Sequence, residues 1–289
     1  MSKTVVPTIE SSNQLLITLL DKKKPFLITR LGWSIGFVTY CYVNHIEYSS
    51  SLLNKLQTHD GIYCNTLHDV KQFAQEYLNA IKNSTYLAAF PNFQSSFLQM
   101  QNYFINTCAL STLHNRSLEP FWSILENKIP WTHKLFGKKI LIVNPFIDSM
   151  KKQKDNNFQM FKNKKIFLDN QEIIFYKSFN CLAGNRPHNS WKETYEIMCN
   201  DIKDLDFDIA LLGCGGYGLP LCNFIYKKMN KSAIYIGGGL QLLFGVMGKR
   251  WEDDPMWKKI MKESDSIFIR PSGDEILKNN QMIENACYW

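Results

Sequence analysis

The amino-acid sequence predicts an α/β fold built on a doubly wound, mostly parallel sheet, and three observations carry this prediction. The apolar segment 209–212 leads into a turn rich in glycine, and a helix-like apolar pattern follows it. A second apolar segment, 233–236, comes next and also runs into glycines. Further short apolar segments at 25–29 and 140–143 end in polar or turn-forming residues. Parallel strands joined by helices, with glycines where the strands end, are typical of sheets that admit a phosphate at their carboxyl edge.

The glycine turn after the first of these strands has the spacing Gly-x-Gly-x-x-Gly, from Gly213 to Gly218. This spacing matches a dinucleotide-binding fingerprint, but a nicotinamide or flavin enzyme also needs a carboxylate about 20 residues further on. The corresponding position falls on Tyr235, Ile236 and Gly237, which include no acid. The missing acid also counts against a methyltransferase, because the ribose of its cofactor usually contacts an acidic residue at this position. Nucleotide or sugar-phosphate binding is therefore the favoured interpretation, with a tight glycine turn that binds no ligand as the alternative.

The first third of the chain predicts one strand among several helices. A helix is expected near 13–20, and the strand 25–29 ends at Arg30. An arginine at the end of a strand suits a loop at the ligand-binding edge of the sheet, although pairing with a carboxylate is an equal alternative. Residues 37–116 are predicted to form helices separated by short turns, with aromatic residues at spacings that suit core packing. The sheet is therefore expected to carry a helical elaboration at its N-terminal side.

Glu119 lies in a stiff and apolar stretch of sequence, because Pro120, Phe121 and Trp122 follow it directly. Such surroundings raise the pKa of a carboxyl group and suit a general base. A glutamate at a helix end that pairs with Arg116 is the alternative. Glu119 is therefore a candidate base, and the alternative stays open.

The remaining sequence continues the alternation of strands and helices. Four aspartates between 201 and 208 precede a strand, so we predict a solvated face at the far end of the sheet and no metal site. The aromatic C-terminus, 287–289, is expected to dock on the body of the domain. Further elements expected are a lysine-rich helix at 149–164, a strand at 172–176, helices at 190–202 and 255–262, and a short strand at 267–269.

Length and composition bound the fold and its partners. With 289 residues, 45% of them hydrophobic and 20% charged, the chain can bury a core and could form one large domain or two. The net charge of +7 is spread over patches such as 22–24 and 162–165, so solvated faces are favoured over nucleic-acid binding. No apolar run reaches the roughly 18 residues of a membrane span, and the N-terminus, 1–4, lacks the apolar block of a secretory signal. A cytoplasmic protein is therefore expected.

The eight cysteines form no CxxC pair and no zinc-like spacing, which indicates reduced and mostly buried thiols. Cys214 lies inside the glycine turn, but no histidine follows it at a suggestive spacing. We therefore interpret Cys214 as a small residue that fits the turn and not as a nucleophile. The six histidines are scattered and predict neither a metal cluster nor a Ser/His/Asp arrangement.

Six segments carry a resemblance to known proteins: 118–120, 137–146, 213–220, 236–245, 248–251 and 287–289. They resemble a family of polysaccharide-biosynthesis proteins found in bacteria and large DNA viruses. More remotely, the two glycine-ended strands and the helix between them resemble the C-terminal half of GT-D type glycosyltransferases, whose doubly wound sheet binds a nucleotide-sugar. The close resemblance covers roughly residues 110–289, whereas the N-terminal third is covered only at 30–32.

One departure from the GT-D pattern concerns metal binding. GT-D enzymes place an Asp-x-Glu metal motif just after the arginine and glycine that match Arg30 and Gly32, whereas this chain has Trp33-Ser-Ile35. The resemblance then implies either that cationic side chains neutralise the donor diphosphate or that catalysis has been lost. Lys249 and Arg250, together with Arg30, favour the first option, because arginine binds phosphate oxygens in a bidentate manner. We expect neither a divalent metal nor another cofactor.

The resemblance implies a glycosyltransferase that moves a hexose, or a deoxyhexose such as rhamnose, from a nucleotide-sugar to the hydroxyl of a glycan acceptor. Residues 1–136 would form an α/β part on the acceptor side and 137–289 a Rossmann-like nucleotide-sugar-binding part, or both would form one continuous domain. If the chain is viral, the host cytoplasm is the expected location. A non-catalytic protein that binds nucleotide-sugars or glycans is the first alternative, and a methyltransferase with an adenine cofactor is the second. The oligomeric state is not predicted.

The expected site combines catalytic and donor-binding residues. Glu119 would deprotonate the acceptor hydroxyl, and Arg30 would stabilise charge on the leaving diphosphate. Backbone amides of the glycine turn would hold the diphosphate, two basic residues would balance its charge, amide side chains would bind sugar hydroxyls or the base, and a tryptophan would offer a stacking surface. The donor-binding residues expected are Gly213, Gly215, Gly216, Tyr217, Gly218, Gly237, Gly238, Gly239, Gln241, Lys249, Arg250, Trp251, Asn144 and Asn185.

Overall fold

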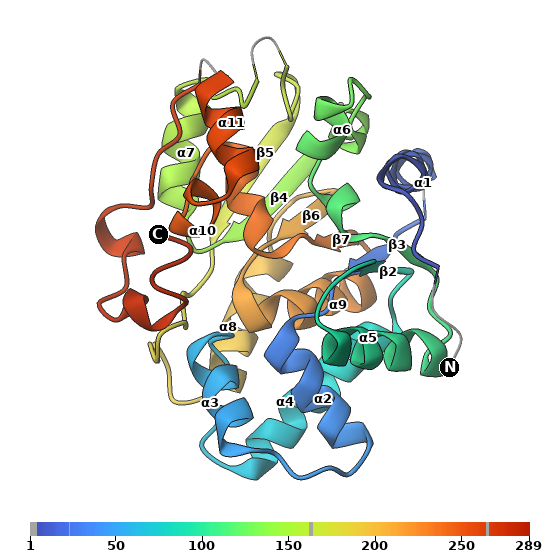
Figure 1. Cartoon of the computed structure of the whole chain (residues 1–289), viewed down its shortest axis with the longest axis vertical. Coiled ribbons are helices and arrows are strands. Elements are labelled where there is room, and N and C mark those ends of the chain that lie inside the picture. The colour runs from blue at the N-terminus through green and yellow to red at the C-terminus, as the bar shows by residue number, and fades with distance from the viewer. Residues whose placement is uncertain (1–4, 23, 162–163, 264–265) are drawn as a thin grey trace.

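The computed structural model describes residues 5–22, 24–161, 164–263 and 266–289, which form one sheet of seven parallel strands (Figure 1). The strand order across the sheet is β3-β2-β1-β7-β6-β4-β5, and every pairing within it is parallel. The predicted α/β, Rossmann-like fold class is therefore confirmed at this level. The strands are β1 (Leu27–Thr29), β2 (Tyr86–Ala89), β3 (Thr112–His114), β4 (Lys139–Asn144), β5 (Glu172–Lys177), β6 (Ile209–Leu212) and β7 (Ser232–Tyr235).

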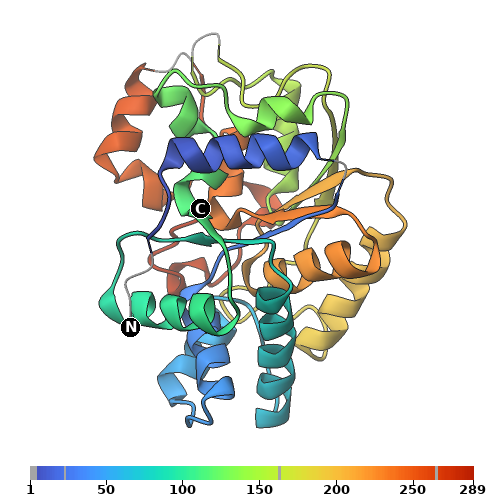
Figure 2. The ribbon, with the colours of Figure 1, turned by 90° about the vertical axis from the view of Figure 1, so that its right-hand side faces the viewer.

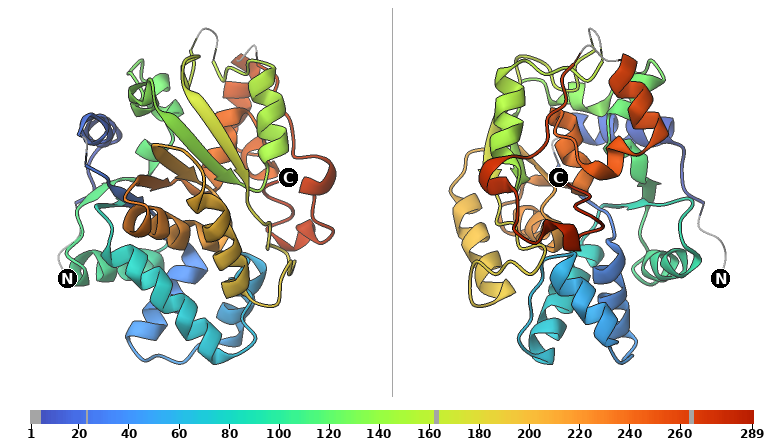
Figure 3. Two further views of the ribbon diagram at one scale, coloured as in Figure 1. Left: turned by 180° about the vertical axis from the view of Figure 1, so that it is seen from behind. Right: turned by 60° about the vertical axis from the view of Figure 1, so that its left-hand side comes forward.

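Helices cover both faces of the sheet (Figure 3). Within the described residues, no helix has both the length and the apolar character needed to cross a bilayer. The helices are α1 (Ile9–Asp21), α2 (Trp33–Val43), α3 (Ser50–Thr58), α4 (Leu67–Lys82), α5 (Ser95–Thr107), α6 (Phe121–Leu125), α7 (Ile147–Asp155), α8 (Trp191–Lys203), α9 (Gly218–Lys228), α10 (Lys249–Glu252) and α11 (Pro255–Glu263).

The sheet is doubly wound, because helices pack on both of its faces and bury one apolar cluster on each face. Alternate residues of a strand point to opposite faces. In β4, Leu141 and Val143 accordingly join one cluster, whereas Ile140 and Ile142 join the other. The first cluster includes residues of α2, α4, α5, α8 and α9, and the second includes residues of α1, α6, α7 and α11. Figure 2 shows α1, in blue, crossing the second face beside α6.

The pairing of β1 with β7 joins the two predicted parts of the chain into one sheet. Ile28 lies opposite Ile234, and both side chains are fully buried. Strands β1 to β3 come from residues 1–136, and strands β4 to β7 come from 137–289. The described strands of the two parts therefore share a single sheet.

Several expectations about secondary structure were wrong. Residues 37–116 contain the strands β2 and β3 besides helices. These strands are only 4 and 3 residues long, too short to show a period, and they become strands through their pairing with β1 and with each other. The lysine-rich helix ends at Asp155, and 267–269 contributes only a bridge from Ile269 to Val246. Residues 1–4, 23, 162–163 and 264–265, which include parts of the N-terminus and of both lysine patches, lie outside the described residues.

The predicted solvated face lies at the amino ends of β4 and β6. Lys139, which begins β4, pairs through its Nζ with Asp206 at 2.5 Å. Its backbone N–H donates to Asp208 Oδ2 at 2.7 Å. These aspartates therefore tie the start of β4 to the start of β6, at the opposite end from the carboxyl edge, as expected.

The C-terminal segment 266–289 packs beside α7 and α10 (Figure 1). Trp289 is buried, and its indole Nε1 donates to the backbone oxygen of Glu275 at 2.7 Å. Arg270 Nη1 donates to the backbone oxygen of Trp289 at 2.8 Å. The backbone N–H of Lys249 donates to the same oxygen at 3.1 Å. The expected docking of the aromatic C-terminus is therefore confirmed.

Candidate functional site

A cavity of about 760 Å³ opens at the carboxyl edge of the sheet. Its lining includes Arg30, Asn144, Gly213 and Gly237, which lie at or just beyond the ends of β1, β4, β6 and β7. The chain leaves β1 toward α2 on one face and leaves the neighbouring β7 toward the 3-10 helix η4 (Gly237–Phe244) on the other. Ligands of open α/β sheets bind in the crevice where neighbouring connections diverge in this way. The cavity therefore occupies the position at which this class of fold binds its ligands.

The structure brings only some of the predicted site residues to this cavity. Arg250 and Gln241 lie in its lining, far along the chain from Arg30. Asn185, by contrast, is exposed and donates through Nδ2 to the backbone oxygen of Asn180 at 2.6 Å. Predicted residues in the lining are Arg30, Asn144, Gly213, Gly215, Gly237, Gly238, Gln241 and Arg250, whereas Glu119, Asn185, Gly216, Tyr217, Gly218, Gly239, Lys249 and Trp251 are outside it.

The amides of the glycine turn are mostly engaged inside the protein. The N–H of Gly213 donates to the backbone oxygen of Val143 at 2.9 Å, and that of Gly216 donates to the backbone oxygen of Asp60 at 2.8 Å. The N–H of Gly218 donates to the backbone oxygen of Gly215. The amides at these three positions therefore already have partners inside the protein, and the binding of a diphosphate by this turn stays a prediction.

Close packing explains two of the glycines. A Cβ atom on Gly213 would lie 2.5 Å from the backbone oxygen of Gly237, and one on Gly218 would lie 2.0 Å from the ring of Tyr235. Tyr217, between these glycines, is itself buried in the core. The glycine spacing therefore permits the turn after β6 to pack against the end of β7, which corresponds to the alternative of a tight turn.

The amide side chains of Asn144 and Gln241 also serve internal contacts, and only 2% and 1% of them are exposed. Asn144 Nδ2 donates to the backbone oxygen of Gly213 at 2.8 Å, and its Oδ1 accepts the N–H of Phe146. Gln241 Nε2 donates to the backbone oxygens of Val246 and Tyr288 at 3.2 and 3.1 Å. These side chains hold the cavity walls in place, and their known hydrogen bonds would have to break before they bound a sugar.

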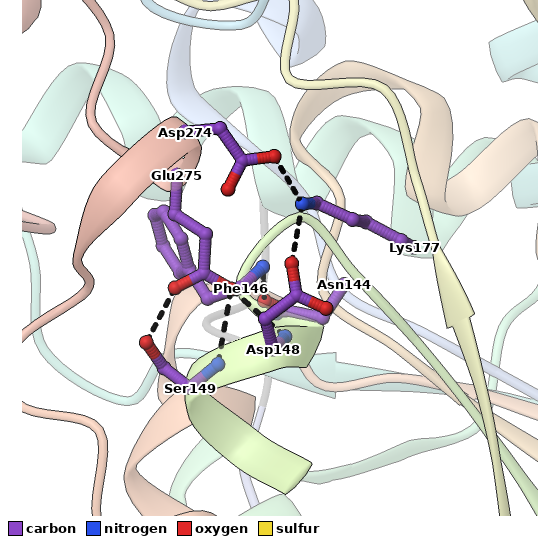
Figure 4. A network of polar contacts seen from close by, with 7 residues as sticks. All are labelled: Asn144, Phe146, Asp148, Ser149, Lys177, Asp274 and Glu275. Carbon is purple, nitrogen blue, oxygen red and sulfur yellow. Dashed lines mark hydrogen bonds and ion pairs between the residues drawn. The ribbon is translucent and has the colours of Figure 1, made fainter. Parts of the chain in front are cut away.

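The N-terminus of α7, next to Asn144, already holds an anion supplied by the protein (Figure 4). The buried carboxylate of Glu275 accepts the N–H of Asp148 at 2.9 Å and that of Ser149 at 3.2 Å, and it also accepts the Ser149 hydroxyl. Lys177 pairs with Asp148 and with Asp274 at 2.5 and 2.8 Å. Because a helix N-terminus is a natural anion site, this carboxylate caps α7 and ties the C-terminal segment to β4 and β5.

Arg30 and Glu119 form a pair beside β7. Arg30 Nη1 donates to the backbone oxygen of Ile236 at 2.9 Å and lies 3.7 Å from Glu119 Oε1. Glu119 Oε2 accepts the indole N–H of Trp122 at 2.9 Å. Among the described residues no ion pair joins Glu119 to Arg116, whose guanidinium lies over the Trp122 ring at 4.4 Å and whose backbone oxygen accepts the Glu119 N–H at 3.1 Å. The alternative of a Glu119–Arg116 pair is therefore wrong, and Glu119 supports Arg30 from outside the cavity lining.

Asp60 is a cavity residue that the sequence analysis missed. Its carboxylate accepts a hydrogen bond from the Ser34 hydroxyl at the first turn of α2. Burial raises the pKa of Asp60 to about 7, although the Ser34 hydrogen bond opposes the shift. The neighbouring His59 also lines the cavity, and burial lowers its pKa. Asp60 precedes Gly61 after a helix, which in the sequence resembles an ordinary turn.

The other cavity walls are cationic and aromatic. Lys55, also missed from the sequence, lies in the lining with its Nζ 4.6 Å from the ring centre of Trp33. Phe90, Phe93 and Phe97 pack together with ring centres 5.0 to 5.3 Å apart and form one side of the cavity. The cavity thus combines positive charge, the carboxyl groups of Asp60 and Glu284, and aromatic surface.

Groups of three or more histidine, cysteine, aspartate or glutamate side chains suited to a metal ion do not occur within the described ranges. Comparison of the chain with known protein families, with curated proteins and with solved structures gives no match.

We predict that Asp60→Asn makes the protein more stable at pH 8 and leaves its stability nearly unchanged at pH 4. The unfolded aspartate ionises near pH 4, whereas the folded one ionises near pH 7. Ionisation therefore favours the unfolded state increasingly from about pH 4 to pH 7, and the penalty is constant above that range. Asparagine cannot ionise and can still accept from Ser34. Melting temperatures at both pH values check this, and a gain that is equal at pH 4 and pH 8 would contradict it.

We also predict that Glu275→Ala lowers the free energy of unfolding by about 3 kcal/mol, because it leaves buried donors of Asp148 and Ser149 without a partner. Glu263→Ala is the control, since Glu263 lies on the surface and only approaches Lys259 at 3.9 Å. The control should change stability by less than about 0.5 kcal/mol. Urea unfolding measures both values, and equal losses would argue against the cap.

Proposed function

We propose that the chain is a metal-independent glycosyltransferase that uses a nucleotide-sugar donor. The observation that carries this proposal is one cavity in which Arg30, Lys55 and Arg250 accompany Asp60, a carboxyl group that is not paired with any of these three cations in the ion pairs of the described residues. Departure of a nucleoside diphosphate needs positive charge at the leaving oxygen, which arginine and lysine supply. A cavity of about 760 Å³ suits such a ligand, because small-molecule sites span roughly 300–1,000 Å³. The resemblance carried by 213–220 and 236–251 supports the same activity.

In this proposal Asp60 is the general base. A carboxylate with a pKa of about 7 can accept a proton at neutral pH, and Asp60 reaches the cavity. It would take the proton of the acceptor hydroxyl while the hydroxyl oxygen forms a bond to C1 of the donor sugar. The bond between C1 and the diphosphate oxygen would break, and its electron pair would leave with the nucleoside diphosphate. The cationic side chains would stabilise that negative charge.

Donor and acceptor would occupy different walls of the cavity. Arg250 and Lys55 would bind the donor diphosphate, with Gly237 and Gly238 lining the floor beside it. A glycan acceptor would lie along the aromatic side that includes Phe93, which is 48% exposed. The sugar transferred would be a hexose or a deoxyhexose such as rhamnose. We further propose a cytoplasmic location, in the host if the chain is viral, and no nucleic-acid partner.

A second candidate function is non-catalytic binding of a nucleotide-sugar or a glycan. Trp33, Ser34 and Ile35 favour it, because they stand where GT-D enzymes place their acidic metal motif. Such a protein would use the cationic and aromatic walls for recognition without chemistry. The two candidates differ in whether nucleoside diphosphate is released.

A panel of nucleotide-sugars with a chelator tests the proposal. We expect one class of donor to raise the melting temperature and, with a glycan acceptor, to release its nucleoside diphosphate despite the chelator. A melting shift without release under all acceptors would favour the non-catalytic binder. A shift with S-adenosylmethionine and with no nucleotide-sugar would favour a methyltransferase. Activity that returns only when a divalent ion is added would show that the metal-independent mechanism is wrong.

Two isosteric variants separate the candidate bases. We expect Asp60→Asn to lower kcat by roughly 100-fold or more while the melting shift with donor is nearly unchanged. Glu119→Gln should retain turnover and mainly raise KM for the donor, because Glu119 contacts Arg30 and lies outside the cavity lining. The reverse result, with activity lost in Glu119→Gln and kept in Asp60→Asn, would return the base to the glutamate predicted from the sequence.

A further inference from the structure

Arg250 already has an anionic partner in the cavity, and this partner is Glu284. Both residues line the cavity, and Arg250 Nη2 donates to Glu284 Oε2. The guanidinium lies 4.8 Å from the ring centre of Tyr288, and its Nη1 lies 3.4 Å from the Tyr288 hydroxyl. Although burial opposes the shift, Arg250 holds the pKa of Glu284 below its usual value. The pair therefore consists of a guanidinium and an ionised carboxylate at neutral pH.

A strained turn holds Glu284 in this position. Glu284, Asn285 and Ala286 have φ angles of 45°, 56° and 62°, so three consecutive residues are left-handed. The left-handed region is unfavourable for residues other than glycine. Such residues occupy it singly far more readily than in succession. Strain of this kind persists only where the surroundings impose it, and it is concentrated at ligand clamps and switches.

The chain that follows the turn is tied down by contacts that do not involve the Glu284 side chain. Gln241 Nε2 donates to the backbone oxygen of Tyr288 at 3.1 Å, and the N–H of Arg250 donates to the backbone oxygen of Cys287 at the same distance. A change confined to 284–286 would therefore leave Arg250 and the docked C-terminus in place. The Cys287 N–H, which donates to the backbone oxygen of Ile283 at 3.0 Å, closes the turn and would report on such a change.

We infer that Glu284 is a placeholder. Its carboxylate occupies the position beside Arg250 that a diphosphate group takes when it binds and displaces Glu284. A guanidinium binds carboxylates and phosphates with the same bidentate geometry, so both anions compete for one position. A cation in a cavity is costly without a counter-charge, which Glu284 supplies until the ligand arrives. A diphosphate carries more negative charge than one carboxylate and would also meet Lys55 and Arg30 in the same cavity. This inference rests on the proposed function for the sugar and the base, and its test needs only the diphosphate.

Calorimetric titration of the full chain with inorganic pyrophosphate tests the placeholder. We expect Glu284→Gln to bind pyrophosphate about tenfold more tightly than the unaltered protein, because the competing charge is gone. Glu252→Gln is the matched control, since Glu252 also pairs with an arginine of this segment, Arg270, but lies outside the cavity lining. The control should bind pyrophosphate as the unaltered protein does. Arg250→Gln should weaken binding whether or not Glu284 is present.

Equal or weaker binding by Glu284→Gln, or no binding by any variant, would overturn the inference. Hydrogen exchange on the unaltered protein provides a second test if the variant fails to fold. Pyrophosphate should accelerate exchange of the Cys287 amide as the turn relaxes, and slower or unchanged exchange would count against displacement of Glu284. Failure of the proposed function gives a different result, namely tight pyrophosphate binding without release of nucleoside diphosphate from any nucleotide-sugar.

Discussion

The parallel pairing of β1 with β7 is the interaction on which the rest of the structure depends. It joins strands from the two parts of the sequence, and it brings their carboxyl ends to one edge of the sheet. There Arg30 donates to the backbone oxygen of Ile236, and the chain diverges toward α2 on one face and η4 on the other. Because neither connection crosses the gap above these two strands, a cavity can form there. Cations from the first part and glycines from the second part share that cavity only through this pairing.

Carboxylates of the protein itself occupy several positions where an external anion could bind. Glu119 faces Arg30, Glu275 caps α7, and Glu284 pairs with Arg250. Their surroundings differ, so Glu275 and Glu284 have different effects on the structure. Glu275 is buried and accepts several hydrogen bonds, so it fixes the C-terminal segment on the sheet. Glu284 lines the cavity on a strained turn, so its contact is the one that a stronger anion can replace.

At the site, the glycines serve close packing, whereas the charge comes from side chains. Gly213 and Gly218 allow close packing between the ends of β6 and β7, and their amides bond within the protein. In the proposed function, neutralisation of the diphosphate group therefore falls to side chains such as Lys55 and Arg250. Asp60 is held beside them by Ser34 at the start of α2, where burial keeps its pKa about 7. A titratable carboxyl group and several cations thus lie in one cavity, and the proposed group transfer from a diphosphate uses them as proton acceptor and counter-charges.

The sequence by itself determined the α/β class and the strands β1, β4, β5, β6 and β7, because apolar segments with polar or glycine ends are local patterns. It also identified Arg30 and Arg250 as cavity residues. Only the tertiary structure decided that β2 and β3 are strands, since their short segments acquire that form through pairing. It likewise decided that Asp60 and Lys55 belong to the cavity and that Glu284 meets Arg250. The physical reason is that these contacts join residues distant in sequence, so they depend on strand order and helix placement, which no local spacing encodes.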